Sequence, residues 1–257
     1  MRQIIANAIL IIVVLAWLGS FATGQLPQRE VTMKTDDINV LELRNYLLRP
    51  NTVEQFQTLF NEQFVGPMND LGGYTVGQFT IDDEKDRFVW MRGFENMQTR
   101  VKFLNDFYLG TAWKTHRTEA NSMIINSDNV HLLRPLTEGI KRNSLQNKGE
   151  IGVVDFYVCN SSLDKVIELF RKEYLPFLDN SNVSGVTMWV SEMSENDFPR
   201  LPVFQDKNLL VTMTRYKNQR EYLQKTKQIN SMPEKLNTAM MELITTRNQL
   251  VLIPFGD

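Results

Sequence analysis

Polar and apolar residues alternate over much of the segment 40–50, where the chain reads Val-Leu-Glu-Leu-Arg-Asn-Tyr-Leu-Leu-Arg-Pro. A period of two is typical of a β-strand whose two faces meet different surroundings. We expect the apolar face to pack against helices and the polar face to point into the space between two sheets. The apolar face carries Leu41, Leu43 and Leu47, and the polar face carries Glu42, Arg44 and Tyr46.

The spacing changes to three and four residues directly after this strand. Such spacing predicts a helix with one buried stripe. We expect Thr52 to cap this helix, with Gln55 reaching back as in a capping box, and Pro67 to end it. The stripe consists of Val53, Phe56, Phe60 and Phe64.

A second copy of the strand and helix begins near Ile151. Ser162 takes the cap position, Pro176 ends the helix, and the apolar stripe recurs at a constant offset. The coincidence of stripe, cap and terminator predicts an internal duplication. At the same offset, the positions of Glu42, Arg44 and Tyr46 are taken by uncharged residues. This favours a single ligand-binding site, in the first half. The repeated stripe is Leu163, Val166, Phe170 and Tyr174, and the residues at the strand positions are Gly152, Val154 and Phe156.

Both copies continue with the same kinds of element, so the predicted fold class is α+β. The order β-α-β-β-α-β is that of a ferredoxin-like unit, here expected twice in tandem. Because both helices of a unit cover one face of its sheet, the two bare faces should pack against each other and enclose a pocket. The later elements are hairpins at 74–81 with 87–94 and 185–190 with 209–216, helical spacing at 97–108 and 236–243, last strands at 129–135 and 248–254, and an insertion at 191–208.

The N-terminal residues differ in composition from the rest of the chain. Arg2 precedes an apolar run from Ala8 to Gly19, and small residues follow. This pattern predicts a cleaved signal peptide at 1–24 and export to the periplasm or extracellular space of a bacterial envelope. An uncleaved anchor is the alternative, although the run is shorter than the roughly twenty residues that span a bilayer. We expect no stable membrane insertion after cleavage. The other predicted segments are a disordered lead-in at 25–39, a first domain at 40–136, a linker at 137–150 and a second domain at 151–257.

Composition and charge narrow the classes of function. The chain has 28 basic and 30 acidic residues, which are intermixed along the sequence. Nucleic-acid binding needs a clustered basic face, so we expect no nucleic-acid partner. A single cysteine, Cys159, excludes an intrachain disulfide. The two histidines and one cysteine lack the spacing of a metal site, and we expect neither a metal nor another cofactor.

Several of these segments together resemble the NIPSNAP domain. The resemblance is carried by Glu42-Leu43-Arg44-x-Tyr46, by Phe88-Val89-Trp90-Met91-Arg92-Gly93-Phe94, by Trp113 in a helix and by Asn129-x-x-Leu132-Leu133-Arg134-Pro135. It covers about residues 40–136, and the second half departs from the motif. The resemblance implies a dimeric α/β-barrel fold, whose superfamily includes cofactor-free monooxygenases, haem-degrading enzymes and plain binding proteins. It implies no general activity for the NIPSNAP family itself.

The candidate ligand-binding residues are expected to line the barrel interior. In the functional interpretation Arg44 binds an anion, Tyr46 offers a hydroxyl and Glu42 acts as a base or orients the other groups. In the structural alternative Glu42 and Arg44 only pair with each other or with Arg92. His131 is either a general base, a haem ligand or a residue of the rim that donates to the backbone. The full candidate set is Glu42, Arg44, Tyr46, Trp90, Arg92 and His131.

Three functions remain open on the sequence. The first is an exported protein that binds a small aromatic or anionic organic molecule between its two sheets. The second is a cofactor-free monooxygenase or isomerase that acts on a phenol-like substrate, so enzyme activity is left undecided. The third is a structural or interaction protein of the envelope whose barrel interior is filled by side chains. A homodimer is compatible with all three.

Overall fold

The computed structural model describes residues 37–136, 140–141, 150–160 and 162–255. These residues lie in one compact unit, 35–257. The predicted signal peptide, 1–24, and most of the predicted lead-in and linker lie outside the described residues. Within the described ranges, no helix is both long enough and apolar enough to cross a membrane.

The first half follows the predicted order of elements, with one more helix than expected. Strand β2 (Val40–Leu48) leads into a continuous helical run that contains a π-helical turn, and a β-hairpin, two helices and two strands follow. The run consists of α1 (Val53–Phe60), η1 (Asn61–Val65) and α2 (Gly66–Asp70). The later elements are β3 (Tyr74–Ile81), β4 (Glu84–Phe94), α3 (Met97–Leu109), α4 (Thr111–Met123), β5 (Ile124–Asn126) and β6 (Val130–Pro135).

The second half has the same order, again with a pair of helices before the last strand. It also has a π-helical turn at the same place in its first helical run. Its elements are β8 (Ile151–Cys159), α5 (Leu163–Leu169), η2 (Phe170–Tyr174), α6 (Leu175–Asn180), β9 (Thr187–Ser191), β10 (Leu209–Tyr216), α7 (Gln219–Ile229), α8 (Glu234–Leu243) and β11 (Ile244–Pro254).

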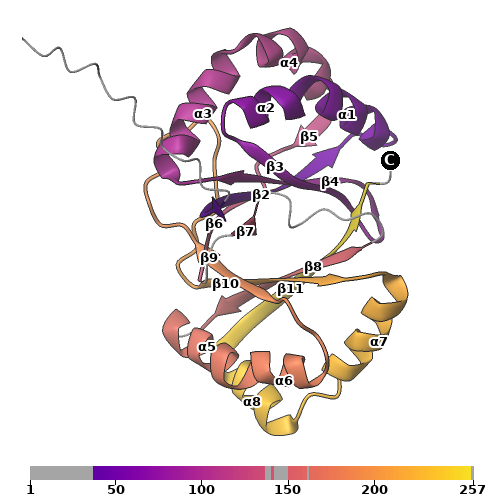
Figure 1. The fold of residues 1–257 in the computed structure, drawn as a ribbon, viewed down its shortest axis with the longest axis vertical. Coiled ribbons are helices and arrows are strands. Elements are labelled where there is room, and N and C mark those ends of the chain that lie inside the picture. Colours follow the sequence, from indigo (N-terminus) through magenta and orange to yellow (C-terminus); the bar gives the residue numbers. More distant parts are fainter. Residues whose placement is uncertain (1–36, 137–139, 142–149, 161, 256–257) are drawn as a thin grey trace, which may run out of the picture. The chain divides into compact units, whose positions relative to one another are not determined.

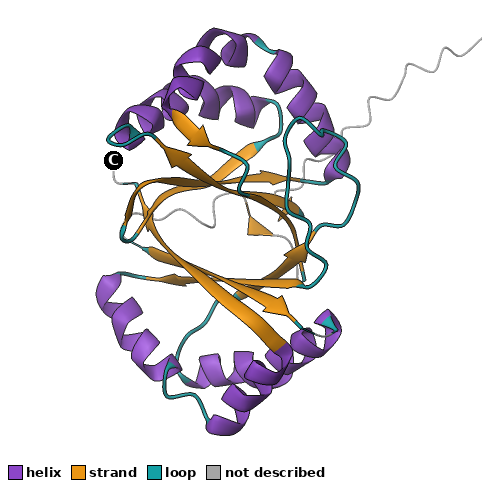
Figure 2. Cartoon of the chain, turned by 180° about the vertical axis from the view of Figure 1, so that it is seen from behind, coloured by secondary structure: helices purple, strands orange, loops and turns teal. Residues whose placement is uncertain are grey.

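Strands of both halves join in one antiparallel sheet that closes into an eight-stranded barrel. The order is β4-β3-β11-β8-β10-β9-β6-β2, and β2 pairs with β4 to complete the ring. The halves meet at the β3–β11 and β6–β9 pairs. Helices α1 to α4 cover one outer side of the barrel and α5 to α8 the other (Figure 1; Figure 2 shows the strands from behind). These findings confirm the α+β class and the closed barrel.

Two short strands form a second, separate pairing. Strand β1 (Asp37–Ile38) pairs with β7 (Ile140–Lys141), so the lead-in expected to be disordered ends in a strand, and the expected linker contains another. Ile38 is fully buried and belongs to the core inside the barrel. A two-residue strand is too short to give a periodic signal, which is why the sequence pattern did not predict it.

The buried apolar residues form three layers, as the architecture requires. One cluster lies inside the barrel and combines residues of both halves, such as Leu43 and Phe156. A second lies between the sheet and α1 to α4, and a third between the sheet and α5 to α8. Both faces of most strands are therefore buried, and this decides where the candidate residues point.

Helix capping differs from the prediction. Asn96 and Asn218 begin α3 and α7, and the side chain of each accepts a hydrogen bond from the backbone N–H three residues on, at 2.8 and 3.0 Å. Thr52 and Ser162, the expected caps, make no side-chain capping hydrogen bond. The Thr52 hydroxyl instead donates to the backbone carbonyl oxygen of Arg49 at 2.8 Å.

Candidate functional site

Strand β2 turns its polar face toward the helices and not into the barrel, so the predicted facing was wrong. Leu41 and Leu43 belong to the core inside the barrel, whereas Tyr46 packs in the cluster under α1 to α4. Every residue of β2 except Leu47 is buried, so alternation offered no solvent-exposed face by which to orient the strand. Apolar residues of the other half fill the barrel interior opposite Leu41 and Leu43. Helix α3 lies against the opposite face of β2 and provides an ion-pair partner for Glu42.

Glu42, Arg44, Arg92 and Arg100 form a buried charge cluster between the sheet and α3. Each of these side chains is at most 1% exposed. The Glu42 carboxylate accepts hydrogen bonds from Arg44 Nη1 at 2.8 Å, from Arg92 Nε at 3.0 Å and from Arg100 Nε at 2.7 Å. Arg100 is the member that the sequence pattern missed. It lies on the buried stripe of α3 with Phe103, Leu104 and Phe107, where an apolar residue would be expected.

In this cluster one carboxylate pairs with three guanidinium groups, so the cluster as a whole carries an excess of positive charge. Burial alone would raise the pKa of Glu42, but Arg92, Arg44 and Arg100 together hold it well below its usual range. A carboxylate held this firmly in its charged form is a poor general base. The geometry therefore favours the structural interpretation of Glu42 and Arg44 over the catalytic one.

A small aromatic cavity lies beside the charge cluster, on the same side of the sheet. It has a volume of about 140 Å³, and Tyr46, Trp90 and Tyr108 are among the residues that line it. The Tyr46 hydroxyl accepts a hydrogen bond from Arg44 Nε at 3.0 Å. The Trp90 indole Nε1 is buried and has no hydrogen-bond partner among the described residues. Five of the six predicted site residues are thus brought together, under the helices and outside the barrel interior.

His131 is separated from those five and lines the barrel interior, as predicted. It faces a cavity of about 530 Å³ at one end of the barrel, which we call the lumen cavity. Strands of both halves contribute to its wall. The lining residues are Leu43, Asn45, Asn129, His131, Phe156, Val158, Val203, Phe204, Gln205, Asp206, Leu209, Asn248 and Leu250.

The lumen cavity combines aromatic rings with unpartnered polar atoms. The ring of His131 contacts those of Phe156 and Phe204, with centroid distances of 4.7 and 5.3 Å. His131 Nδ1 and Asn45 Oδ1 are buried and have no hydrogen-bond partner among the described residues. Burial lowers the pKa of His131 to about 4, although the Asp206 carboxylate acts in the opposite direction. The imidazole is therefore neutral at pH 7 and can act as a hydrogen-bond acceptor or donor, depending on its tautomer.

Phe204 comes from the insertion between β9 and β10, which closes part of the lumen cavity. Its backbone N–H donates to the Val130 carbonyl oxygen at 2.7 Å, and its carbonyl oxygen accepts from the Leu132 N–H at 3.3 Å. The segment is thus held along β6. The Phe204 ring remains 49% exposed at the cavity edge.

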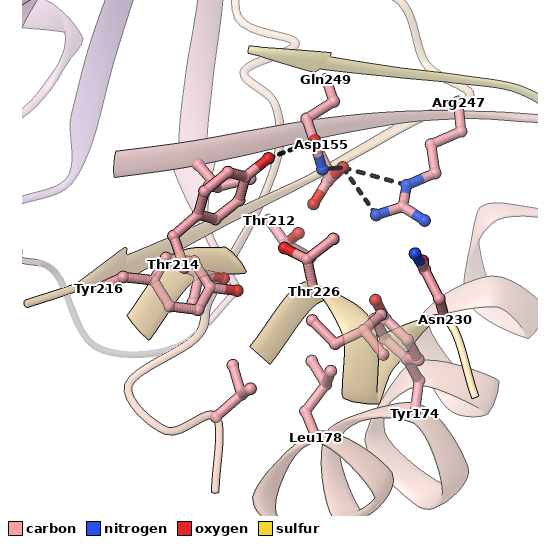
Figure 3. Close-up of a pocket in the computed structure, with 14 residues that line it drawn as sticks. Asp155, Tyr174, Leu178, Thr212, Thr214, Tyr216, Thr226, Asn230, Arg247 and Gln249 are labelled. Carbon is pink, nitrogen blue, oxygen red and sulfur yellow. Dashed lines mark hydrogen bonds and ion pairs between the residues drawn. The ribbon is translucent and has the colours of Figure 1, made fainter. Parts of the chain in front are cut away.

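The second half carries its own buried charge, Asp155, which the sequence comparison did not single out. Four residues, 49–52, join β2 to α1, but only three, 160–162, join β8 to α5. The number of residues between equivalent positions of the two halves is therefore one larger for the strands than for the helices. Because a shift of one residue exchanges the two faces of a strand, the helix spacing pairs β2 residues with β8 residues of the opposite face. Val154 and Phe156 point into the barrel, and Asp155 points toward the helices. There Asp155 meets Arg247 and Gln249 in a polar cavity (Figure 3).

Within the described residues, no group of three or more histidine, cysteine, aspartate or glutamate side chains is placed to hold a metal ion.

No family model and no curated protein matches this chain. Solved structures do match its fold. A protein from Fusobacterium nucleatum subsp. nucleatum, provisionally described as a monooxygenase, is 12% identical over 86% of this chain and 94% of its own, with a TM-score of 0.56. An anthrone oxidase-like protein is 8% identical over 86% of this chain and 92% of its own, with a TM-score of 0.53. A NIPSNAP-like domain protein from Burkholderia xenovorans is 20% identical over 42% of this chain and 94% of its own, with a TM-score of 0.37. The first two likenesses concern the fold alone.

Proposed function

We propose that the protein binds a small aromatic molecule with one or two polar groups in the lumen cavity. The observation that carries this proposal is the pair of unpartnered buried atoms, His131 Nδ1 and Asn45 Oδ1, in a wall otherwise rich in apolar and aromatic groups. Leaving such atoms without a partner costs free energy, and a ligand hydroxyl would satisfy them. The volume of about 530 Å³ also lies within the range of about 300–1,000 Å³ of small-molecule sites.

The charge of the wall favours a neutral ligand over an anionic one. Among the residues that line the lumen cavity, Asp206 is acidic, and no lysine or arginine is present. The arginines that suggested an anion lie on the other face of the sheet, around Glu42. A phenol can donate to Asn45 Oδ1 and place its ring beside Phe156, whereas a benzoate would leave its charge unpaired. Phenols and quinols are therefore the ligand class we propose.

Thermal-shift screening of phenols, quinols, aromatic acids and haem, followed by calorimetric titration of the hits, tests this assignment. His131→Phe keeps the ring contacts and removes the nitrogen, and it should weaken binding of a phenol about five-fold, the effect of one hydrogen bond. Asn248→Trp fills the exposed mouth of the cavity and should abolish binding. Asn105→Trp, on the exposed surface of α3, is the matched control and should bind normally.

Three results would contradict the proposal. The first is phenol binding that both His131→Phe and Asn248→Trp leave unchanged. The second is stronger binding of benzoates than of the matching phenols, since this would place the ligand beside the arginines. The third is a preference for haem, which would give a different ligand class.

A second candidate function is cofactor-free oxygenation or isomerisation of a phenol-like substrate. The position of the neutral imidazole of His131 motivates it, because one tautomer could accept the phenol proton and leave a phenolate to react. Its pKa of about 4 makes it a weak base, so this function ranks behind binding. Two proteins of similar fold carry names from this chemistry, which motivates the assay but assigns no activity. Oxygen consumption and product formation with each hit are the readouts. Turnover that is lost in His131→Phe, while the binding affinity stays within ten-fold of wild type, would support an enzyme. Binding without turnover would support the binding function and contradict the enzymatic one.

The third function, a filled barrel without a ligand, has less support. Apolar residues such as Met91 and Trp189 do fill much of the interior, but the lumen cavity remains at one end. The finer parts of the sequence interpretation also remain proposals: membership of the NIPSNAP family, a tandem of ferredoxin-like units at 40–136 and 151–257, and export after cleavage at residue 24. In each half the four main strands follow the ferredoxin-like order, which supports the tandem. Mass determination of the mature N-terminus tests the cleavage.

A further inference from the structure

A second, more polar cavity lies in the second half, on the helix-covered side of the sheet. It has a volume of about 210 Å³, enough for roughly seven water molecules at about 30 Å³ each. Strands β8, β10 and β11 form its floor, and α6 and α7 contribute to its walls (Figure 3). It lies on the opposite face of the sheet from the lumen cavity, so a ligand here would be independent of the function proposed above.

The floor of this cavity holds the buried carboxylate of Asp155, of which one oxygen accepts hydrogen bonds from neighbouring side chains. Asp155 is 6% exposed. Its Oδ1 accepts hydrogen bonds from Arg247 Nε at 3.0 Å and from Gln249 Nε2 at 2.8 Å, and Arg247 Nη2 also lies 3.0 Å from it. All the hydrogen bonds and ion pairs that the described residues make with this carboxylate fall on Oδ1. Oδ2 therefore remains as an acceptor for a group that enters the cavity.

The cavity exists because β10 carries small hydroxyl residues where β4 carries large ones. Thr212 pairs with Asp155 at the position that Trp90 takes on β4, and Thr214 stands where Arg92 stands. Thr212 and Thr214 are both buried and both line the cavity. In the first half the larger side chains fill the corresponding space and join the charge cluster.

The lining suits a neutral molecule with many hydroxyl groups. Asp155 and Arg247 carry opposite charges in direct contact, so a charged ligand would meet no uncompensated partner. Hydroxyl and amide groups surround them, including those of Tyr222, Thr226 and Asn230. Burial raises the pKa of Tyr222, so its hydroxyl stays protonated; it donates to Gln249 Oε1 at 3.4 Å. Hydroxyl groups on a ligand both donate and accept, which matches this mixture of partners.

We propose that this cavity binds a neutral polyhydroxylated molecule of monosaccharide size, with Asp155 Oδ2, Gln249 and the Thr212 and Thr214 hydroxyls as its hydrogen-bonding partners. The guanidinium of Arg247, whose side chain is 40% exposed, forms part of the rim. A pyranose or a cyclitol has the required size and number of hydroxyl groups.

Calorimetric titration of the whole chain with glucose, galactose and myo-inositol tests the proposal, with glucosamine and glucuronate as charged counterparts. We expect saturable binding of at least one neutral probe. Thr212→Val and Thr214→Val keep the side-chain shape, and each should weaken binding about five-fold, as for one lost hydrogen bond. Asn230→Trp changes an exposed residue at the rim and should abolish binding.

Asn248→Trp, which closes the lumen cavity, should leave binding of the polyol unchanged, and this separates the two proposals. Circular dichroism and thermal melting confirm that each variant is folded. Absence of saturable binding for all three neutral probes would overturn the site. Tighter binding of glucosamine or glucuronate than of glucose would overturn the ligand class, and binding unaffected by Asn230→Trp would overturn the location.

Discussion

Glu42 is the residue on which the charge cluster depends, because it is the single carboxylate among three buried guanidinium groups. Burying a charge costs free energy unless the charge is paired, and here the Glu42 carboxylate is the counter-charge for all three guanidinium groups. The aromatic rings around Arg92 add to this environment: its guanidinium carbon lies 4.8 Å from the centroid of Phe103 and 5.1 Å from that of Trp90. The cluster is therefore a structural device whose loss should affect the whole first half.

Glu42→Gln should lower the free energy of unfolding by about 3–5 kcal/mol, since it leaves the arginines buried without their counter-charge. Urea denaturation measures this change. Glu84→Gln is the matched control: Glu84 pairs with Arg87 at 2.9 Å, but its side chain is 51% exposed, and such exposed pairs are worth about 1 kcal/mol or less. Equal losses in the two variants would contradict the assigned role of the cluster.

His131 should give stability a pH dependence of its own. Its pKa is about 4 in the folded protein and 6.5 in a free side chain, so between these values only the unfolded chain takes up the proton. Stability is then lost as the pH falls from about 6.5 to 4, by at most roughly 3 kcal/mol. His131→Phe removes this contribution, so the difference in unfolding free energy between variant and wild type should shift by that amount over the window. A difference that stays constant would show that His131 is not buried in its neutral form.

At the level of elements, close backbone approach fixes how β1 docks against the barrel. A Cβ atom added at Gly93 on β4 would lie 2.4 Å from Ile38 Cδ1 and 2.8 Å from its Cγ1. Ile38 is fully buried, so it has little freedom to move away. Glycine at this position thus makes room for the β1 side chain in the barrel interior.

Gly93→Ala should destabilise the protein by about 1–3 kcal/mol through overpacking. In an Ile38→Ala background the same substitution should cost much less, because the colliding side chain is gone. Gly66→Ala is the matched control: its Cβ would meet nothing within 4 Å, and Gly66 is helical, so alanine should be neutral or stabilising by up to about 1 kcal/mol. Additive effects of the Gly93 and Ile38 substitutions would contradict this docking.

The order of the elements was predictable from the sequence, but the facing of β2 and the residue-by-residue correspondence of β2 with β8 were not. Periodicity identified both strands and the helices after them. Both faces of these strands are buried, however, so the pattern could not tell the barrel side from the helix side, and Glu42 was assigned to the wrong one. The loop before α5 is one residue shorter than the loop before α1. The spacing between the two helices therefore pairs Arg44 with Val154, whereas its structural equivalent is Asp155. Strand alternation does group His131 with Asn129 and Leu133, and the structure places all three on the side that faces the barrel interior.

At the scale of the whole molecule, closure of the barrel from two halves creates the proposed binding site. Leu43 and His131 come from one half, Phe156 and Leu250 from the other, and all four line the lumen cavity. Neither half supplies the complete wall. The cavity is thus a property of the closed ring of strands, and it is separated by the sheet from the charge cluster that first drew attention in the sequence.

The most direct test of this account is a crystal structure of the protein soaked with para-bromophenol, with the bromine located by its anomalous signal. The account predicts a bromine peak in the lumen cavity, with the ring against Phe156 and the phenol oxygen within hydrogen-bonding distance of His131 Nδ1 or Asn45 Oδ1. Bromine found only in the aromatic cavity beside Trp90, or only on the molecular surface, would contradict it.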